Sequence, residues 1–135
     1  NAMPLSNDRN TPYMDSVLVG FPVAAGVKIF AGALVAANAT GFAAPGAGAA
    51  TLTYLGRAEE QIDNTGGADG AKTILVRRRL AFKWLNSAAD LITQADIGKS
   101  CYIFDDQTVA KTSGANTRSP AGKVLRIDID GVWVE

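Results

Sequence analysis

Two pairs of aspartates come nearest to acid–base chemistry in this chain: Asp105 with Asp106, and Asp128 with Asp130. Cleavage of a glycosidic bond needs two carboxyl groups on either side of that bond. Adjacent residues of a strand point to opposite faces, and neither pair converges on one point without help from the fold. Aspartate is also an ordinary residue of β-turns. We therefore expect these residues in turns, with no catalytic site.

Two glycine-containing segments have partial features of ligand-binding loops. Gly98-Lys99-Ser100 resembles the end of a phosphate-binding loop, but position 93, where such a loop has a glycine, is a threonine. Residues 63–70 contain three glycines and two aspartates, which suggests a calcium or phosphate site. The ligand spacing of an EF-hand is missing, and nearly every residue favours a turn. We therefore expect a hairpin loop at 63–70, and no metal or other cofactor.

The composition counts against several classes of protein. The chain has no histidine, which is the commonest general base and the commonest transition-metal ligand. Its one cysteine, Cys101, cannot form an intrachain disulfide, which suits a reducing compartment, and we expect it to be a small buried hydrophobe. Thirteen basic and thirteen acidic residues give zero formal charge, so nucleic acid is not a favoured partner despite the cluster Arg77-Arg78-Arg79. We expect a protein that is not an enzyme.

The hydrophobic pattern predicts an all-β fold. Short alternating runs are separated by turn residues roughly every 8–12 positions, which is typical of a small barrel or sandwich of antiparallel strands. We expect one strand over 72–84, a hairpin at Asp130-Gly131, and a single helical turn over 93–98 that is capped by Thr93. Residues 17–135 are predicted to form one β domain.

No apolar run approaches the ~20 residues that span a bilayer, so we expect no membrane partner, and no signal peptide is visible.

Residues 1–16 are polar, contain Pro4 and Pro12, and lack any helical or strand period. We expect a flexible arm, which is either a frayed terminus or a segment that orders on a neighbour. We interpret Asn1 and Ala2, which precede Met3, as the remnant of an expression tag.

Aromatic and arginine side chains offer two interpretations. Five aromatic residues suit either base stacking on a barrel face or anchoring in the core or at an interface, and the neutral charge favours anchoring: Tyr54, Trp84, Tyr102, Phe104 and Trp133. Arg78 falls on the apolar face of the alternating run, where it would meet a carboxylate or a neighbouring subunit, unless a bulge returns it to solvent. We predict Arg78, Trp84 and Trp133 at an oligomer interface.

Several turn-rich phrases resemble small proteins encoded in bacteriophage and prophage head-gene clusters, similar in kind to capsid decoration, or cement, proteins. The phrases are GRAEE at 56–60, DNTGGADG at 63–70, DDQTVA at 105–110, TRSPAGKV at 117–124 and GVWV at 131–134. The resemblance covers roughly residues 21–135. It implies a compact β domain on the capsid exterior, often as a homotrimer that bridges copies of the major capsid protein. Such a protein is in the host cytoplasm during assembly and in the virion afterwards.

Members of this family often complete their contact with the shell through an extended N-terminal arm. By position, the residues that we expect to touch the capsid are Leu5, Asn7, Arg9, Pro12 and Tyr13. Two alternatives remain open: another phage head-completion or tail component, or a β-barrel that binds nucleic acid or a small ligand.

Overall fold

The computed structural model describes residues 3–135 and confirms an all-β chain, with 40% of residues in strands and 2% in helix. The helical part is one 3-10 turn, η1 (Gln94–Asp96), where we expected a single helical turn. Asp96 stabilises its start, because the carboxylate accepts hydrogen bonds from the backbone N–H and the hydroxyl of Thr93 at 2.8 and 3.2 Å. The tag remnant predicted at residues 1–2 lies outside the described residues.

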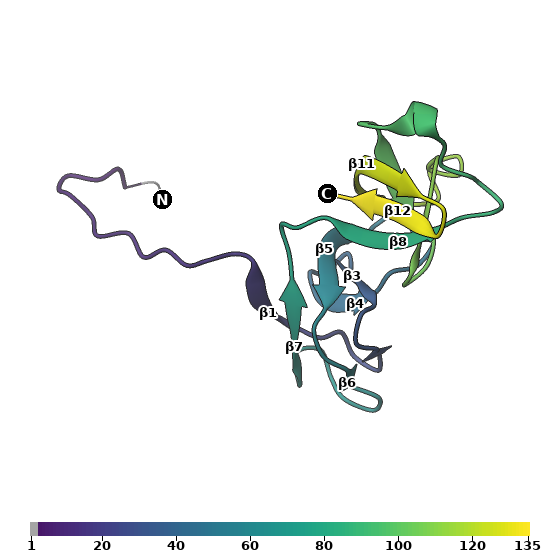
Figure 1. The fold of residues 1–135 in the computed structure, drawn as a ribbon. Helices are drawn as coiled ribbons and strands as arrows, with labels where there is room; N and C mark the ends of the chain where they lie inside the picture. Colours follow the sequence, from purple (N-terminus) through teal and green to yellow (C-terminus); the bar gives the residue numbers. More distant parts are fainter. Residues whose placement is uncertain (1–2) are drawn as a thin grey trace.

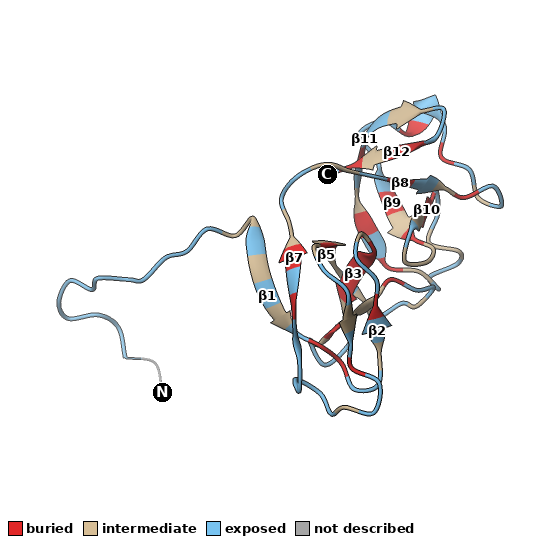
Figure 2. Ribbon diagram, turned by 60° about the horizontal axis from the view of Figure 1, so that its bottom comes forward, coloured by how far each residue is buried: buried red, intermediate tan, exposed pale blue. Residues whose placement is uncertain are grey.

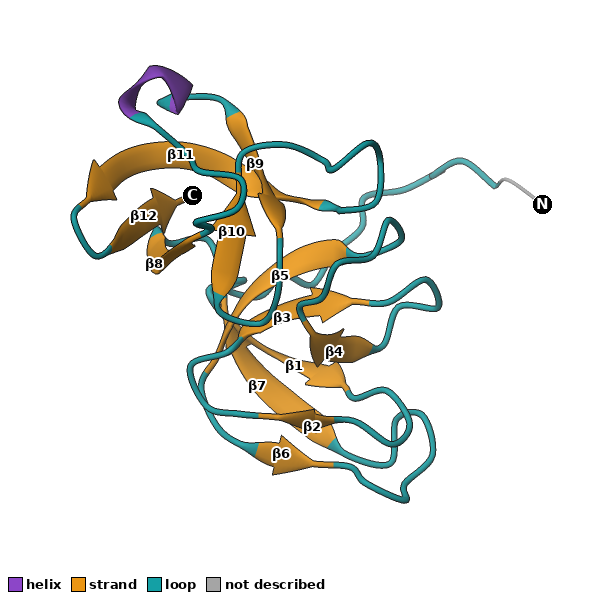
Figure 3. Cartoon of the chain, turned by 90° about the vertical axis from the view of Figure 1, so that its right-hand side faces the viewer, coloured by secondary structure: helices purple, strands orange, loops and turns teal. Residues whose placement is uncertain are grey.

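The N-terminal half forms a five-stranded antiparallel sheet (Figure 3). In spatial order its strands are β1 (Leu18–Pro22), β7 (Thr73–Arg77), β5 (Thr53–Ala58), β3 (Leu34–Ala37) and β4 (Ala43–Pro45). The chain just after β1 crosses to the other end of the sheet, where Val23 bridges Ala43. A small ribbon of β2 (Lys28–Ile29) and β6 (Ile62–Asp63) completes this half.

The C-terminal half is a closed five-stranded barrel. Its strands are β8 (Phe82–Asn86), β9 (Ser100–Ile103), β10 (Thr108–Ala110), β11 (Pro120–Asp128) and β12 (Gly131–Val134). The pairs are antiparallel except β8 with β10, which run parallel. Asp128 pairs with Gly131, so the predicted hairpin at Asp130-Gly131 is present, with Ile129 and Asp130 at its tip.

Each half has its own hydrophobic core, and β3 contributes to both (Figure 2). Side chains of successive strand residues point to opposite faces. Leu34 therefore packs with the barrel cluster, whereas Val35 packs with the cluster under the five-stranded sheet. The main chain joins the halves too, since the Leu34 N–H donates to the carbonyl of Asp106 at 2.8 Å.

Two predictions about the middle of the chain are wrong. The alternating run 72–84 is not one strand, because it divides into β7 and β8, which belong to different sheets. Arg79 lies between them with φ 62°, a left-handed conformation that ends the extended run. The loop at 63–70 is also not a hairpin loop. The strands on either side of it pair elsewhere, β6 with β2 and β7 with β1 and β5.

Residues 3–16 form an extended arm that leaves the body before β1 (Figure 1). Its hydrogen bonds are local: Arg9 donates from Nη1 to the Thr11 hydroxyl, and the Asp15 carboxylate accepts from the Val17 N–H. Among the described residues, no hydrogen bond joins residues 3–15 to the body beyond Val17.

Candidate binding surfaces

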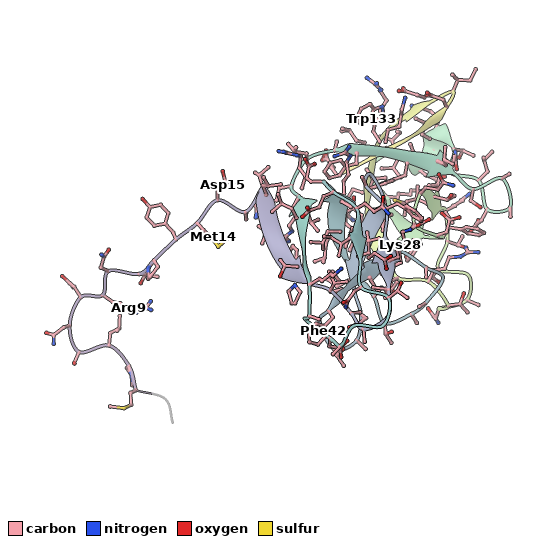
Figure 4. The ribbon with its side chains drawn as sticks, turned by 90° about the horizontal axis from the view of Figure 1, so that it is seen from below. Arg9, Met14, Asp15, Lys28, Phe42 and Trp133 are labelled. Carbon is pink, nitrogen blue, oxygen red and sulfur yellow. The ribbon has the colours of Figure 1, made fainter. Side chains whose placement is uncertain are left out.

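The arm presents exposed side chains, and among the described residues none of them is joined to the body beyond Val17 by a hydrogen bond or ion pair. All five residues predicted for capsid contact are exposed: Leu5, Asn7, Arg9, Pro12 and Tyr13. The large apolar side chains of the arm have high exposed fractions, with Tyr13 at 98%, Met3 at 88%, Leu5 at 72% and Met14 at 71%. Figure 4 shows Arg9, Met14 and Asp15 spaced along the arm, away from the body.

Burial of such side chains on a partner is favourable, by about 1.5–3 kcal/mol for each Leu- or Met-sized residue that becomes fully covered. Pro4 and Pro12 restrict the backbone of the free arm, so less conformational entropy is lost when it is ordered. The arm is thus suited to binding an apolar groove in an extended conformation.

A groove lies between the sheet and the barrel, with a volume of about 740 Å³, and we call it the junction groove. Its lining is Tyr54, Leu55, Arg78, Arg79, Leu80, Ala81, Phe82, Lys123 and Glu135. The segment 78–81, which carries the chain from β7 to β8, contributes four of these residues. The left-handed Arg79 lets the main chain turn from one sheet to the other along this groove.

Three cationic residues, Arg78, Arg79 and Lys123, line the junction groove together with one acidic residue, Glu135. The Nε of Arg78 donates to the carbonyl of Leu55 at 3.4 Å, and its guanidinium lies 5.6 Å from the centre of the Phe21 ring. By contrast, Arg57 and Arg77 both contact the carboxylate of Glu59, at 2.7 and 2.9 Å. The hydrogen bond from Arg77 is the main cause that lowers the pKa of Glu59, so this carboxylate stays charged.

A second hollow, of about 510 Å³, adjoins the junction groove and shares Ala81 with it. Leu125, Arg126 and Trp133 complete its lining. The Trp133 indole N–H donates to the Asp128 carboxylate at 2.8 Å, which fixes the orientation of the ring. The Arg126 guanidinium lies 5.6 Å from the ring centre, so an apolar surface and a cation lie side by side.

The structure therefore separates the three residues that we predicted at an oligomer interface. Arg78 and Trp133 line neighbouring hollows on the surface. Trp84 does not, because only 5% of it is exposed and it belongs to the core of the barrel. Its ring packs inside the closed barrel, so the prediction that this side chain lies at an oligomer interface is wrong.

The carboxylates that we considered for acid–base chemistry form hydrogen bonds and ion pairs with neighbouring groups of the same chain. Asp128 accepts from Arg126 and Trp133, and Asp130 binds the Lys83 ammonium at 2.9 Å. These side-chain hydrogen bonds lower the pKa of both carboxyls, so both are charged at neutral pH and suit no proton donor. Asp105 accepts from the Gln107 N–H at 2.9 Å, as in an ordinary turn.

One further reactive group, the thiol of Cys101, is held inactive by burial. Cys101 is fully buried in the barrel core, which raises the pKa of its thiol to about 11 and leaves it uncharged at neutral pH.

Within residues 3–135, no three His, Cys, Asp or Glu side chains are grouped as metal ligands. None of the helical structure in that range has the length and apolar character to cross a bilayer.

The two hollows were not foreseen from the sequence. Leu80 and Ala81 look like part of an ordinary alternating strand, and no glycine or proline marks the turn that the left-handed Arg79 makes before them. Comparison of the chain with protein families, with curated proteins and with solved structures finds no match.

Proposed function

We propose that this chain is a structural protein of a bacteriophage virion, which decorates or cements the capsid exterior as an oligomer, with a homotrimer as the expected form. The observation that supports this proposal best is the arm of residues 3–16. It extends from a compact β body and carries large apolar side chains that are mostly exposed. Such a segment suits a protein that holds neighbouring subunits together, a role that requires no catalytic centre.

The physical basis is multivalent binding. When several arms belong to one oligomer, each later contact is intramolecular, with an effective concentration in the mM range for short flexible connections. Weak arm contacts then give a tightly bound oligomer. The zero formal charge of the chain reduces repulsion between many copies crowded on one shell.

The partner in this proposal is the major capsid protein. The proposed contacts are the exposed arm residues Leu5, Asn7, Arg9, Pro12 and Tyr13. Tyr13 and Leu5 would supply most of the buried apolar area, and Arg9 would pair with an acidic group of the shell.

The test is co-sedimentation with purified heads of the phage or prophage that encodes this chain, prepared without the protein. Three forms are compared: the full chain, a form without residues 3–16, and a form in which a Gly/Ser segment of equal length replaces the arm. We expect the full chain to bind and both altered forms to bind much more weakly. A full chain that stays in the supernatant at every ratio of protein to heads, and is missing from purified virions, would refute the proposal.

A further inference from the structure

The arm and the junction groove are complementary to each other. The arm carries uncovered apolar side chains, among them Tyr13 and Met14, and two acidic residues, Asp8 and Asp15. The groove offers apolar side chains of both halves together with the guanidinium groups of its 78–79 segment. Within residues 3–135, no hydrogen bond or ion pair joins the arm to the side chains of this groove.

We propose that, in the free protein, the arm of one copy lies in the junction groove of a second copy. Tyr13 is the anchor, packed against Leu55 and Leu80, and the arm carboxylates face Arg78 and Arg79. This inference goes beyond the proposed function, because it concerns the protein before it meets any capsid. The same arm residues then exchange one partner for another when a shell is present.

Charge complementarity is the first argument. Four arginines of the body each contact a carboxylate within 4 Å: Arg57, Arg77, Arg118 and Arg126. Arg78 and Arg79 form no ion pair among the described residues. In the arm, Asp8 also has no ion pair there, and Asp15 accepts only from the Val17 N–H. The groove thus carries cations without an ion-pair partner, with Glu135 as the one acidic residue of its lining, and the arm carries anions without one, so the two surfaces are complementary in charge.

The position of the arm is the second argument. The Arg78 N–H donates to the carbonyl of Val17 at 2.6 Å, so the arm leaves the body at the rim of the groove. From there the arm runs away from the body (Figures 1 and 4). Fourteen extended residues reach up to about 45 Å, far enough to cross into a neighbour.

This arrangement favours a second copy as the occupant. The point where the arm leaves the body lies beside the groove on every copy. When two copies place their grooves side by side, the arm of each copy therefore starts next to the groove of the other. The exchange is then reciprocal and closes on itself, as in a two-fold or cyclic oligomer. A volume of about 740 Å³ is also within the range that binds compact ligands and side-chain clusters, about 300–1,000 Å³.

The test joins the two surfaces by a disulfide between different molecules. A Tyr13→Cys variant with a mass tag is mixed with an untagged Leu80→Cys variant, oxidised, and separated by non-reducing electrophoresis. The matched control replaces Leu80→Cys by Leu91→Cys, since the two leucines are similarly exposed, at 47% and 53%, and Leu91 lies outside the groove. All variants keep the buried Cys101, so any background from this thiol is shared.

We expect the mixed disulfide with Leu80→Cys to exceed the control by roughly tenfold or more, because a docked arm holds the two thiols at a high effective concentration. An equal yield for both partners overturns the proposal. A double variant with Tyr13→Cys and Leu80→Cys in one chain is the companion measurement, and an internal disulfide in monomers, without cross-linked oligomers, would likewise overturn it. Heads are not used, so failure here leaves the capsid proposal standing.

Discussion

The Trp84 indole N–H donates a hydrogen bond to the hydroxyl of Tyr54 at 3.2 Å, and this bond connects the two halves of the molecule. Trp84 lies on β8 of the barrel, and Tyr54 lies on β5 of the five-stranded sheet. Tyr54 packs against the barrel core, although its own strand belongs to the other half. A single pair of side chains thus combines a polar and an apolar contact between the two sheets.

Replacing Tyr54→Phe should lower the free energy of unfolding by about 1–3 kcal/mol, because the indole N–H of Trp84 is left without an acceptor in a buried place. Urea unfolding monitored by tryptophan fluorescence measures this loss. The matched control is Tyr102→Phe, since the Tyr102 hydroxyl makes none of the hydrogen bonds found in residues 3–135. An equal loss in both variants would contradict the structural role of the Trp84–Tyr54 bond.

Stability should fall at alkaline pH because of two buried groups. Burial raises the pKa of Cys101 to about 11 and that of Tyr54 to about 12, from ordinary values of 9.0 and 10.0. Both groups keep their protons in the folded chain over a range in which the unfolded chain releases them. Their contribution is therefore complete below about pH 9 and is lost as the pH rises toward 12.

Denaturant titrations at a series of pH values test this expectation. Tyr54→Phe should show a shallower loss between pH 10 and 12 than the unaltered chain, because one of the two groups is gone. A thiol reagent should label Cys101 at pH 8 only after denaturant is added. Rapid labelling of the native chain would show that the thiol is not buried as described.

The arm should add nothing to the stability of the body. Residues 3–15 share no hydrogen bond with the body beyond Val17 among the described residues, and their large side chains are exposed. Deleting residues 3–16 should leave the free energy of unfolding unchanged within about 0.5 kcal/mol at low protein concentration, as for other changes at exposed sites. A larger loss would mean that the arm packs on its own body.

Features with a strong local signal could be predicted from the sequence. The Asp130-Gly131 hairpin, the helical turn after Thr93 and the extended arm depend on residues close together in the chain, and each is found in the structure. The all-β class follows from the alternating pattern, which reports which side chains can be buried on one face of a strand.

Features that depend on pairing between distant segments could not be predicted. The run 72–84 alternates on both sides of Arg78, with no glycine or proline in it, so the sequence does not show that its halves enter different sheets at Arg79. The parallel pairing of β8 with β10 leaves no mark in either strand. The two hollows arise from the way the halves meet. The burial of Trp84 depends on the closure of the barrel, which pairs strands from distant parts of the chain and is not visible in the sequence around Trp84.

Gly56 is required where β5 and β7 approach closely. Its φ of +145° is rarely adopted by other residues, and an added Cβ would collide with the carbonyl oxygen of Arg77. Gly56→Ala should cost at least about 2 kcal/mol, since strain and a steric clash with the backbone act together. Gly48→Ala is the control, because the added Cβ would lie 3.8 Å from the nearest atom, at the carbonyl of Phe104. A mild effect at Gly56 would contradict the register between β5 and β7.

Asp90 holds two loops of the barrel together. Its Oδ2 accepts from the Thr112 hydroxyl at 2.6 Å, from the Thr112 N–H at 3.0 Å and from Arg118 at 2.9 Å. Asp90→Ala should therefore loosen the 111–119 loop. Amide hydrogen exchange at Thr112 should become faster, whereas Asp106→Ala, whose side chain makes no such bond in the described part of the chain, should leave it unchanged.

The Asp90 carboxylate should also make the stability of the 111–119 loop depend on pH in the acid range. The hydrogen bond from the Thr112 hydroxyl is the largest cause that lowers the pKa of Asp90, and Arg118 adds to it. A lowered pKa in the folded chain contributes stability that is present above the ordinary pKa of an aspartate and is lost as the pH falls through the folded value. Exchange at Thr112 should thus stay slow at pH 5 and accelerate, after correction for the intrinsic rate, below about pH 4. In Asp90→Ala this acceleration should disappear, and an unaltered acid profile in that variant would assign the effect to another carboxyl group.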